Sequence, residues 1–278
     1  MNQLVLAPTS LVDTPQDEYV EAAAWAGYKA VGIRLHPSNL TTMPFHPIVG
    51  DAAKIKRVKD TLKAAGMQIV DLLSFYVVPD INFDSYKAAM ALGAELGGKY
   101  ALVIGDDADK SRCYANFATL CELAAGFGLT CAVENASNRP IGTVPDVVAM
   151  IQASGVKNAV VCLDPLNHFR CGHTAADIAR LDPKLFPYTQ LSDGKYNPGE
   201  PSETVGRTAA GIRALPGEGD LPIPELFKVL PKGLPISIEL PQSLSKALPG
   251  SNGQIMSPRD WAKVTYDRTK AYLERIGA

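Results

Sequence analysis

The chain has few histidines and no CxxC motif, which limits the metal sites that it can build. The sequence has 278 residues and contains four histidines: His36, His46, His168 and His173. It contains five cysteines, none of them in a CxxC pair: Cys113, Cys121, Cys131, Cys162 and Cys171. An odd number of unpaired cysteines argues against a disulfide framework and against a structural zinc site. We therefore expect buried, reduced thiols.

Long apolar runs and dense basic blocks are also missing. The 27 Lys and Arg residues nearly balance the 29 Asp and Glu residues, which gives a net charge of -2. No stretch has the basic density of a nucleic-acid footprint, and no apolar run approaches the roughly 20 residues that cross a bilayer. The first ten residues, MNQLVLAPTS, do not resemble a signal peptide. We expect a cytoplasmic protein that binds neither nucleic acid nor membrane.

A glycine-rich phosphate loop is absent after the first apolar run, where APTSLVDTP has no glycine. This absence disfavours an open, doubly wound sheet of the dinucleotide-binding type. Along the whole chain, short β-rich runs alternate with longer segments of helical period, and eight such units follow one another without a linker. A (β/α)₈ barrel takes about 250 residues. The sequence thus predicts an α/β fold with one TIM-barrel domain over residues 1–278.

The eight units have defined boundaries. The predicted strands span 3–7, 29–34, 67–73, 99–104, 129–134, 158–163, 186–191 and 235–240. The predicted helices span 15–26, 51–66, 83–97, 110–127, 145–155, 174–181, 223–230 and 258–275, and residues such as Thr14 and Ser257 precede them as expected caps. A long irregular insertion at 192–222 follows the seventh strand. Its position predicts a lid or a substrate loop.

Four polar residues close consecutive predicted strands: Glu134, Asp164, Gln190 and Glu239. Because the carboxyl ends of parallel strands lie side by side, we expect these side chains to converge. Three carboxylates and an amide oxygen suit a hard divalent cation such as Mg²⁺ or Mn²⁺. The alternative is structural: strand-end acids that cap helices or pair with arginine.

Several segments give the chain a specific resemblance. They are the VENAS segment, LDPLNHFRCG, QLSDG, RALPGEGDL and the closing SIELP. With these segments the chain resembles the xylose isomerase-like TIM-barrel superfamily, in particular its sugar and sugar-phosphate isomerases and epimerases. The resemblance covers essentially the whole chain. It implies that Glu134, Asp164, Gln190 and Glu239 bind a divalent metal, Mn²⁺ or Mg²⁺, with Co²⁺ or Zn²⁺ as alternatives.

The resemblance also implies a reaction. A metal-dependent isomerase or epimerase of this kind abstracts a proton next to a carbonyl and passes through a metal-stabilised enediolate. Glu134 and Glu239 are then the catalytic pair, and His168 is a candidate proton shuttle. Arg34, Asn167 and Arg213 are candidate substrate-binding residues. The implied partner is a small polyol, keto-sugar or related hydroxy-ketone, and a homo-oligomer is compatible with the family.

Two departures from the family pattern leave alternatives open. Many relatives carry His at the position of Gln190, whereas a subgroup with Gln there includes dehydratases, so a lyase similar to 3-dehydroshikimate or inosose dehydratase remains an alternative. Many relatives also carry His at the position of Asn167, so the sequence does not decide whether Asn167 or His168 faces the site. An ion pair with Glu218 or Asp220 is an equal alternative for Arg213, as structural pairing is for Arg34.

Other functional classes fit the sequence less well. A trinuclear zinc nuclease of a related barrel needs more imidazoles and a basic face. An aldose isomerase of the xylose isomerase type needs a lysine near the fifth strand, and VENASNRP has none. A barrel that binds a sugar without converting it is the remaining alternative, although simple binding does not require three acidic ligands.

Overall fold

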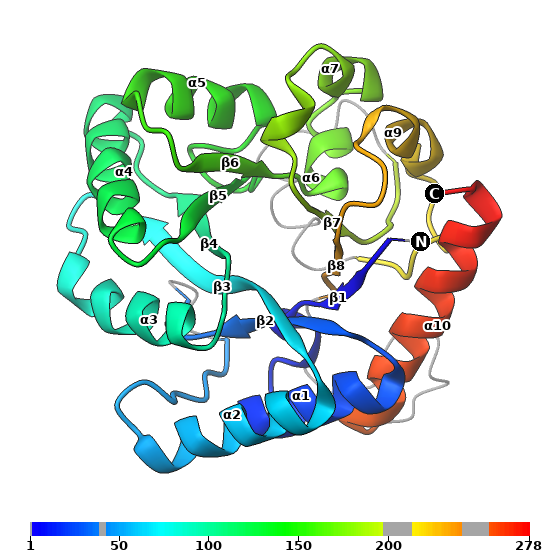
Figure 1. Ribbon diagram of the computed structural model, residues 1–278. Coiled ribbons are helices and arrows are strands. Elements are labelled where there is room, and N and C mark those ends of the chain that lie inside the picture. The colour runs from blue at the N-terminus through cyan, green and yellow to red at the C-terminus, as the bar shows by residue number, and fades with distance from the viewer. Residues whose placement is uncertain (1, 39–42, 197–212, 241–255) are drawn as a thin grey trace.

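Strands and helices alternate along the chain and are arranged as a ring of strands inside a ring of helices (Figure 1). The computed structural model describes residues 2–38, 43–196, 213–240 and 256–278. The strands are β1 (Leu4–Leu6), β2 (Ala30–Arg34), β3 (Gln68–Val77), β4 (Tyr100–Gly105), β5 (Thr130–Glu134), β6 (Ala159–Cys162), β7 (Thr189–Leu191) and β8 (Ile236–Ile238). The α-helices are α1 (Gln16–Ala26), α2 (Ala52–Ala65), α3 (Phe83–Glu95), α4 (Lys110–Ala125), α5 (Val144–Ser154), α6 (Pro165–Arg170), α7 (Ala175–Ala179), α9 (Ile223–Val229) and α10 (Pro258–Ile276). The described residues also form the 3-10 helices η1 (Pro8–Leu11) and η2 (Pro183–Leu185).

The eight strands form one parallel sheet in the order β6-β5-β4-β3-β2-β1-β8-β7. Its two end strands meet through a single parallel bridge between Leu163 and Thr189. The Leu163 carbonyl accepts hydrogen bonds from the Gln190 backbone N–H at 2.8 Å and from the Thr189 hydroxyl at 2.9 Å. The sheet is therefore a nearly closed (β/α)₈ barrel, which confirms the fold that the sequence predicts.

Local sequence signals explain several helix boundaries. As expected, the Ser257 side chain accepts a hydrogen bond from the backbone N–H of Asp260 and caps α10. Gly27 follows α1 with a φ of 113°, a left-handed conformation that favours glycine. The expected cap at Thr14 is wrong, because α1 begins after Pro15 and no side chain accepts a hydrogen bond there.

The region after β6 differs from the prediction. The sequence predicts one helix at 174–181, whereas the chain forms the short helix α6 directly after Asp164 and then α7. Asp164 caps α6, and Pro165 is tolerated in its first turn, where no backbone N–H is needed. Most of the predicted lid loop at 192–222 lies outside the described residues, since 197–212 are not among them.

Strand β3 is longer than predicted and carries a polar residue into the barrel. Its pairing with β4 continues to Val77, beyond the polar Ser74 at which the apolar pattern breaks. Asp71 lies in this strand with 1% exposure. A Cβ atom on Gly32 would lie 2.3 Å from Asp71 Oδ1, so glycine on β2 makes the space that this carboxyl group needs.

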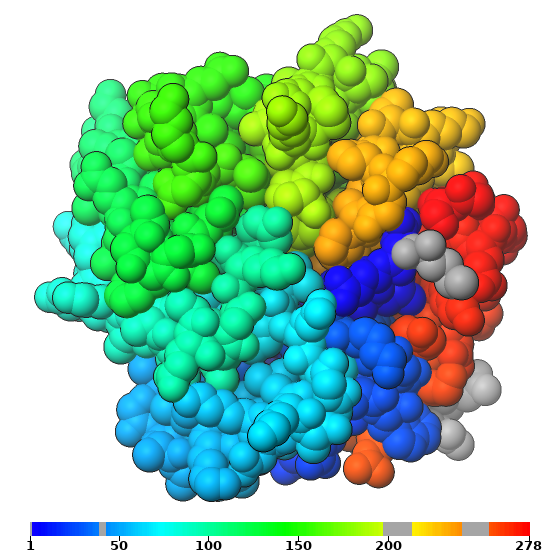
Figure 2. All heavy atoms as spheres, viewed as in Figure 1, coloured from blue at the N-terminus to red at the C-terminus, as the bar shows by residue number. Residues whose placement is uncertain are grey.

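Apolar side chains fill both sides of the strand ring. The larger cluster packs strands against the surrounding helices, and the smaller one fills the interior with Val5, Ala30, Val70, Leu73, Leu102, Ala132, Cys162 and Tyr188. In the space-filling view, atoms cover the centre of the barrel on the face shown (Figure 2). This packing holds the strand ends rigidly, and it is on those ends that the polar residues stand.

The cysteines agree with the expectation of buried, reduced thiols at all but one position. All five cysteines are free thiols, and Cys171 is the one that is not fully buried. Among the described residues, no helix combines the length and apolar character needed to cross a membrane.

Candidate metal and acid–base site

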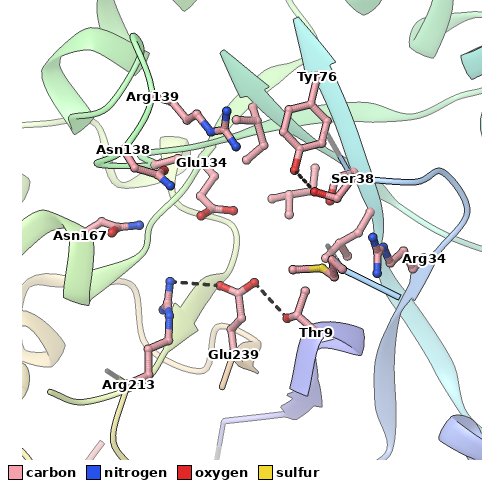
Figure 3. A pocket seen from close by; sticks show the side chains of 16 residues that line it. Thr9, Arg34, Ser38, Tyr76, Glu134, Asn138, Arg139, Asn167, Arg213 and Glu239 are labelled. Carbon is pink, nitrogen blue, oxygen red and sulfur yellow. Dashed lines mark hydrogen bonds and ion pairs between the residues drawn. The ribbon is translucent and has the colours of Figure 1, made fainter. Parts of the chain in front are cut away.

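Three buried carboxylates converge at the carboxyl ends of the strands (Figure 3 shows two of them). Glu134 is the last residue of β5, Asp164 follows β6, and Glu239 directly follows β8. One oxygen atom from each lies within 4.8 Å of the others. The structure thus brings together the three predicted carboxylate ligands, because parallel strands end at the same rim of the barrel.

Asp164 is held by four donors. Its Oδ1 accepts hydrogen bonds from the backbone N–H groups of Leu166 at 2.8 Å and Asn167 at 3.3 Å. Its Oδ2 accepts from the Asn167 side-chain amide and from the Arg213 guanidinium, both at 2.8 Å. The structural alternative for strand-end acids, helix capping together with arginine pairing, is therefore realised at Asp164. These same contacts fix one orientation of the carboxylate.

Gln190 reaches the same centre from β7. Its Nε2 donates to Glu134 Oε2 at 3.3 Å, while its Oε1 is buried and has no hydrogen-bond partner among the described residues. Burial raises the pKa of Glu134 well above its usual range, and the charges of Glu239 and Asp164 raise it further. Arg213 and Gln190 oppose that increase. Glu134 thus takes up a proton more readily than an exposed glutamate.

Glu239 is oriented by the segment after β1. Thr9, in η1, donates its hydroxyl hydrogen to Glu239 Oε1 at 3.0 Å. Glu239 Oε2 is buried without a hydrogen-bond partner in the described residues and lies 3.7 Å from Arg213 Nη2. Burial raises the pKa of Glu239, while Arg213 lowers it and Asp164 raises it. One oxygen atom of this carboxylate therefore remains available to a ligand.

Arg213 places its guanidinium among the carboxylates. Its side chain is 8% exposed, and its Nη1 donates to Ser192 Oγ at 2.9 Å. Burial alone would lower the pKa of Arg213, but Asp164 and Glu239 outweigh burial and raise it. The alternative of an ion pair with Glu218 or Asp220 is wrong. Glu218 contacts Arg268 instead, and Asp220 contacts Lys195.

The predicted substrate-binding residues line one pocket with a volume of about 170 Å³. Arg34, Asn167 and Arg213 all line it, together with Glu134 and Glu239 (Figure 3). They come from β2, α6 and the segment after 212, and they surround the two glutamates. A cavity of this size suits a small molecule.

Among the predicted catalytic and substrate-binding residues, His168 is the one that does not line this pocket. Its Nε2 lies 2.9 Å from the carbonyl oxygen of Thr174, and its ring stacks on His173 at 5.4 Å. It lines a separate groove between α5 and α7. Burial lowers its pKa, so the ring favours the neutral form. Of the two neighbours that the sequence leaves open, Asn167 faces the pocket.

The donor set fits a divalent cation. Glu134, Asp164 and Glu239 offer oxygens close enough to share one ion, and two buried oxygens, Gln190 Oε1 and Glu239 Oε2, lack a hydrogen-bond partner in the described part of the chain. Buried acceptors without donors are costly, and a cation would satisfy them. Carboxylate and amide oxygens favour hard ions such as Mg²⁺ or Mn²⁺. The Arg213 guanidinium supplies positive charge at the same place.

Some supporting residues are not predictable from their position in the sequence. Asn135 is completely buried and joins two strand ends: its Oδ1 accepts from the Asp164 backbone N–H at 2.7 Å, and its Nδ2 donates to the Asp164 carbonyl at 3.1 Å. Thr9 and Ser192 orient Glu239 and Arg213. Asn135 does adjoin Glu134, and a polar residue next to a strand-end ligand is the signal that points to such a role.

Fold and site together define a TIM barrel with an acidic centre at the carboxyl ends of its strands. The chain belongs to the xylose isomerase-like TIM-barrel family, whose model matches residues 20–263. Among curated proteins, none matches the sequence.

Solved structures with the same fold are numerous. A xylose isomerase-like TIM barrel/4-hydroxyphenylpyruvate dioxygenase fusion protein has 18% identity and a TM-score of 0.75, and the alignment covers 99% of this chain but 44% of that one. The IOLI protein with a bound zinc atom has 14% identity and a TM-score of 0.76, with 99% of each chain covered. The probable 3-DHS dehydratase AsbF from Bacillus anthracis has 16% identity and a TM-score of 0.70, with 96% of this chain and 98% of that chain covered. Other matches include two epimerases. At such identities, the likeness shows the fold.

Proposed function

We propose that this chain is a divalent-metal-dependent isomerase or epimerase that removes a proton from the carbon next to a carbonyl group of a small polyhydroxylated substrate. The observation that carries the proposal is the placement of Glu134 and Glu239. These two buried glutamates reach one pocket from different strand ends, and both have raised pKa values (Figure 3). A carboxylate whose pKa is raised accepts a proton more readily, which suits it to general acid–base catalysis.

The two glutamates would divide the proton transfers between them. One removes the proton from the substrate carbon, and the other returns a proton to the carbon, at the same or the opposite face. Thr9 holds one oxygen of Glu239, and Gln190 holds one oxygen of Glu134, so each carboxylate keeps one oxygen to contact the substrate or an ion. General acid–base catalysis of this kind contributes about 10²–10⁴-fold.

Glu134, Asp164, Gln190 and Glu239 would hold the divalent metal, Mn²⁺ or Mg²⁺. When bound, such an ion polarises the substrate carbonyl and makes the neighbouring C–H more acidic. In the proposed enzyme, Asn167 and Arg213 position oxygens of the substrate. Most of the residues that form this centre are buried.

A lyase is the second candidate. The loss of a β-hydroxyl group begins with the same proton abstraction, so the same two glutamates serve either outcome. Gln190 favours this alternative, because its amide replaces the histidine that many relatives carry. The fold similarity to a protein described as a probable 3-DHS dehydratase supports it as well.

Turnover in deuterated water tests both candidates. Purified protein with Mn²⁺ or Mg²⁺ is incubated with ketoses, inososes and 3-dehydroshikimate. An isomerase or epimerase incorporates solvent deuterium at carbon, whereas a dehydratase forms an unsaturated product that absorbs in the ultraviolet. Binding of substrates without exchange or elimination, with either ion, would instead support a non-catalytic sugar-binding barrel.

A further inference from the structure

Arg34 is a buried arginine for which the described residues supply no acidic partner. It ends β2, is 3% exposed and lines the same pocket as the two glutamates. Its Nη1 donates to the Pro44 carbonyl oxygen at 2.6 Å, whereas its Nη2 is buried and has no hydrogen-bond partner in the described structure. The Arg34 guanidinium thus contacts a neutral carbonyl oxygen and lies 5.3 Å from the centroid of the Phe45 ring. Neither contact carries a negative charge.

Other arginines of the pocket are neutralised. Arg139 pairs with Asp106 at 2.8 Å, and Arg213 pairs with Asp164 at 2.8 Å. A buried charge is costly unless it is paired, so proteins keep very few unpaired buried arginines. Burial lowers the pKa of Arg34, as expected for a guanidinium without a counter-charge. Stability of the fold therefore does not explain why a buried arginine stands here without an acidic partner among the described residues.

The surroundings of Arg34 have the character of a binding subsite. Ser38 and Tyr76 lie on the same side of the pocket, with their hydroxyl groups 2.8 Å apart, and Glu134 lies across from them (Figure 3). Hydroxyl groups beside a guanidinium form a common cradle for a carboxylate or phosphate. A substrate held here by one end would extend its other end toward the glutamates.

We propose that Arg34 binds an anionic group of the substrate, a carboxylate or a phosphate, so that the chain acts on acidic rather than neutral sugars or polyols. This inference rests on the proposed function, because it takes the pocket of Glu134 and Glu239 to be the substrate pocket. The guanidinium fork of Arg34, which no acid of the described structure occupies, receives the anion. The opposite end of the substrate then lies at the acid–base pair.

Binding of small analogues without an aldehyde or ketone group tests the inference separately from catalysis. Glycerol, glycerate and glycerol 3-phosphate share a three-carbon skeleton and cannot undergo the proposed proton abstraction. Their affinities are measured by calorimetry for the wild type, Arg34→Met and Arg139→Met, with saturating Mn²⁺ and again with EDTA. Arg139→Met is the matched control, because it removes a pocket arginine whose charge Asp106 already balances.

We expect the wild type to bind at least one of the two anions about tenfold or more tightly than glycerol, which corresponds to one good charge-assisted contact. Arg34→Met should lose this preference, and Arg139→Met should keep most of it. Preference for glycerate or for glycerol 3-phosphate identifies the anion. The same preference should persist in Glu239→Gln, so a failure of the proposed chemistry leaves this result unchanged.

Equal affinity of the wild type for glycerol and both anions would overturn the inference, as would an unchanged preference in Arg34→Met. Thermal unfolding supplies a second measurement. Because Arg34→Met removes an unpaired buried charge, its melting temperature should equal or exceed that of the wild type, whereas a purely structural role predicts a lower one. If Arg34→Met does not fold, Arg34→Lys should still weaken anion binding without affecting glycerol, since it lacks the fork.

Discussion

The ionisation of Asp71 provides a quantitative test of how strongly the barrel interior disfavours a charged carboxylate. This carboxyl group lies inside the barrel with 1% exposure, and its Oδ1 has no hydrogen-bond partner in the described residues. Burial raises the pKa of Asp71 to about 7, the charge of Glu239 contributes to the increase, and the nearby Tyr188 hydroxyl opposes it. In the unfolded chain the same group has its ordinary value of 3.8. Asp71 is therefore mostly protonated in the folded protein at pH values where the unfolded chain is ionised.

The sign and size of the effect follow from linkage. As pH rises above 3.8, the unfolded chain releases the proton that the folded protein retains, so the free energy of unfolding decreases until the pH passes about 7. Each pKa unit corresponds to about 1.4 kcal/mol, so Asp71 costs about 4 kcal/mol of stability at high pH. Of this total, about 2–3 kcal/mol falls between pH 5 and pH 8.

The substitution Asp71→Asn keeps the shape of the side chain and removes the titration. Urea unfolding of both proteins at several pH values between 5 and 8, in EDTA, gives the difference between their free energies of unfolding. We expect the wild type to lose about 2–3 kcal/mol relative to Asp71→Asn across this range, because titrating groups that do not interact with Asp71 cancel in the comparison. A difference that does not change with pH would refute the assignment of Asp71 as a buried, protonated acid.

Three further predictions concern the acidic centre. Glu239→Gln should lower turnover by at least about 10²-fold, since it removes a proton carrier, while circular dichroism and melting temperature stay close to those of the wild type. Arg213→Gln should raise Mn²⁺ affinity about tenfold or more in calorimetry, because the guanidinium supplies positive charge where the ion would bind. Asn135→Ala should lower the free energy of unfolding in urea by about 1–3 kcal/mol, because it leaves the buried backbone N–H of Asp164 unpaired, while the Asp164 carbonyl keeps the hydrogen bond from the His168 N–H.

Control measurements distinguish these specific effects from a general loss of folding or activity. The exposed Glu122→Gln should retain full turnover. Wild-type turnover in Glu239→Gln would contradict the acid–base assignment. Weaker Mn²⁺ binding in Arg213→Gln would show that the guanidinium does not compete with the ion, and a change below about 0.5 kcal/mol in Asn135→Ala would mean that water replaces both hydrogen bonds.

The fold could be predicted because strands covered on both faces have nearly continuous apolar runs, as in TCAVE and AVVC. The convergence of Glu134, Asp164 and Glu239 followed from the parallel topology alone. Side-chain directions could not be predicted in the same way. Asn167 and His168 are adjacent in sequence, and only the helical turn of α6 sends one of them to the pocket and the other to the groove beside α5.

The sequence pattern also could not predict which side chains from distant segments contact each other. Arg213 follows a long irregular insertion, so no periodicity indicates that its guanidinium reaches Asp164 rather than a nearby acid. That no acid of the described residues pairs with Arg34 is likewise a property of three-dimensional packing, because the sequence around it contains no signal for what surrounds a guanidinium. Loop residues and long side chains depend on tertiary contacts that local propensity does not encode.

The single bridge between β6 and β7 makes this junction the weakest part of the strand ring. Two candidate ligands, Glu134 and Asp164, stand on one side of the junction, and the other two, Gln190 and Glu239, stand on the opposite side. An ion or substrate bound by all four side chains would link β5 and β6 to β7 and β8 across the junction that a single bridge closes. Amide hydrogen exchange at Gln190, whose N–H crosses the junction, should slow on binding, so that occupancy of the site also regulates how tightly the barrel closes.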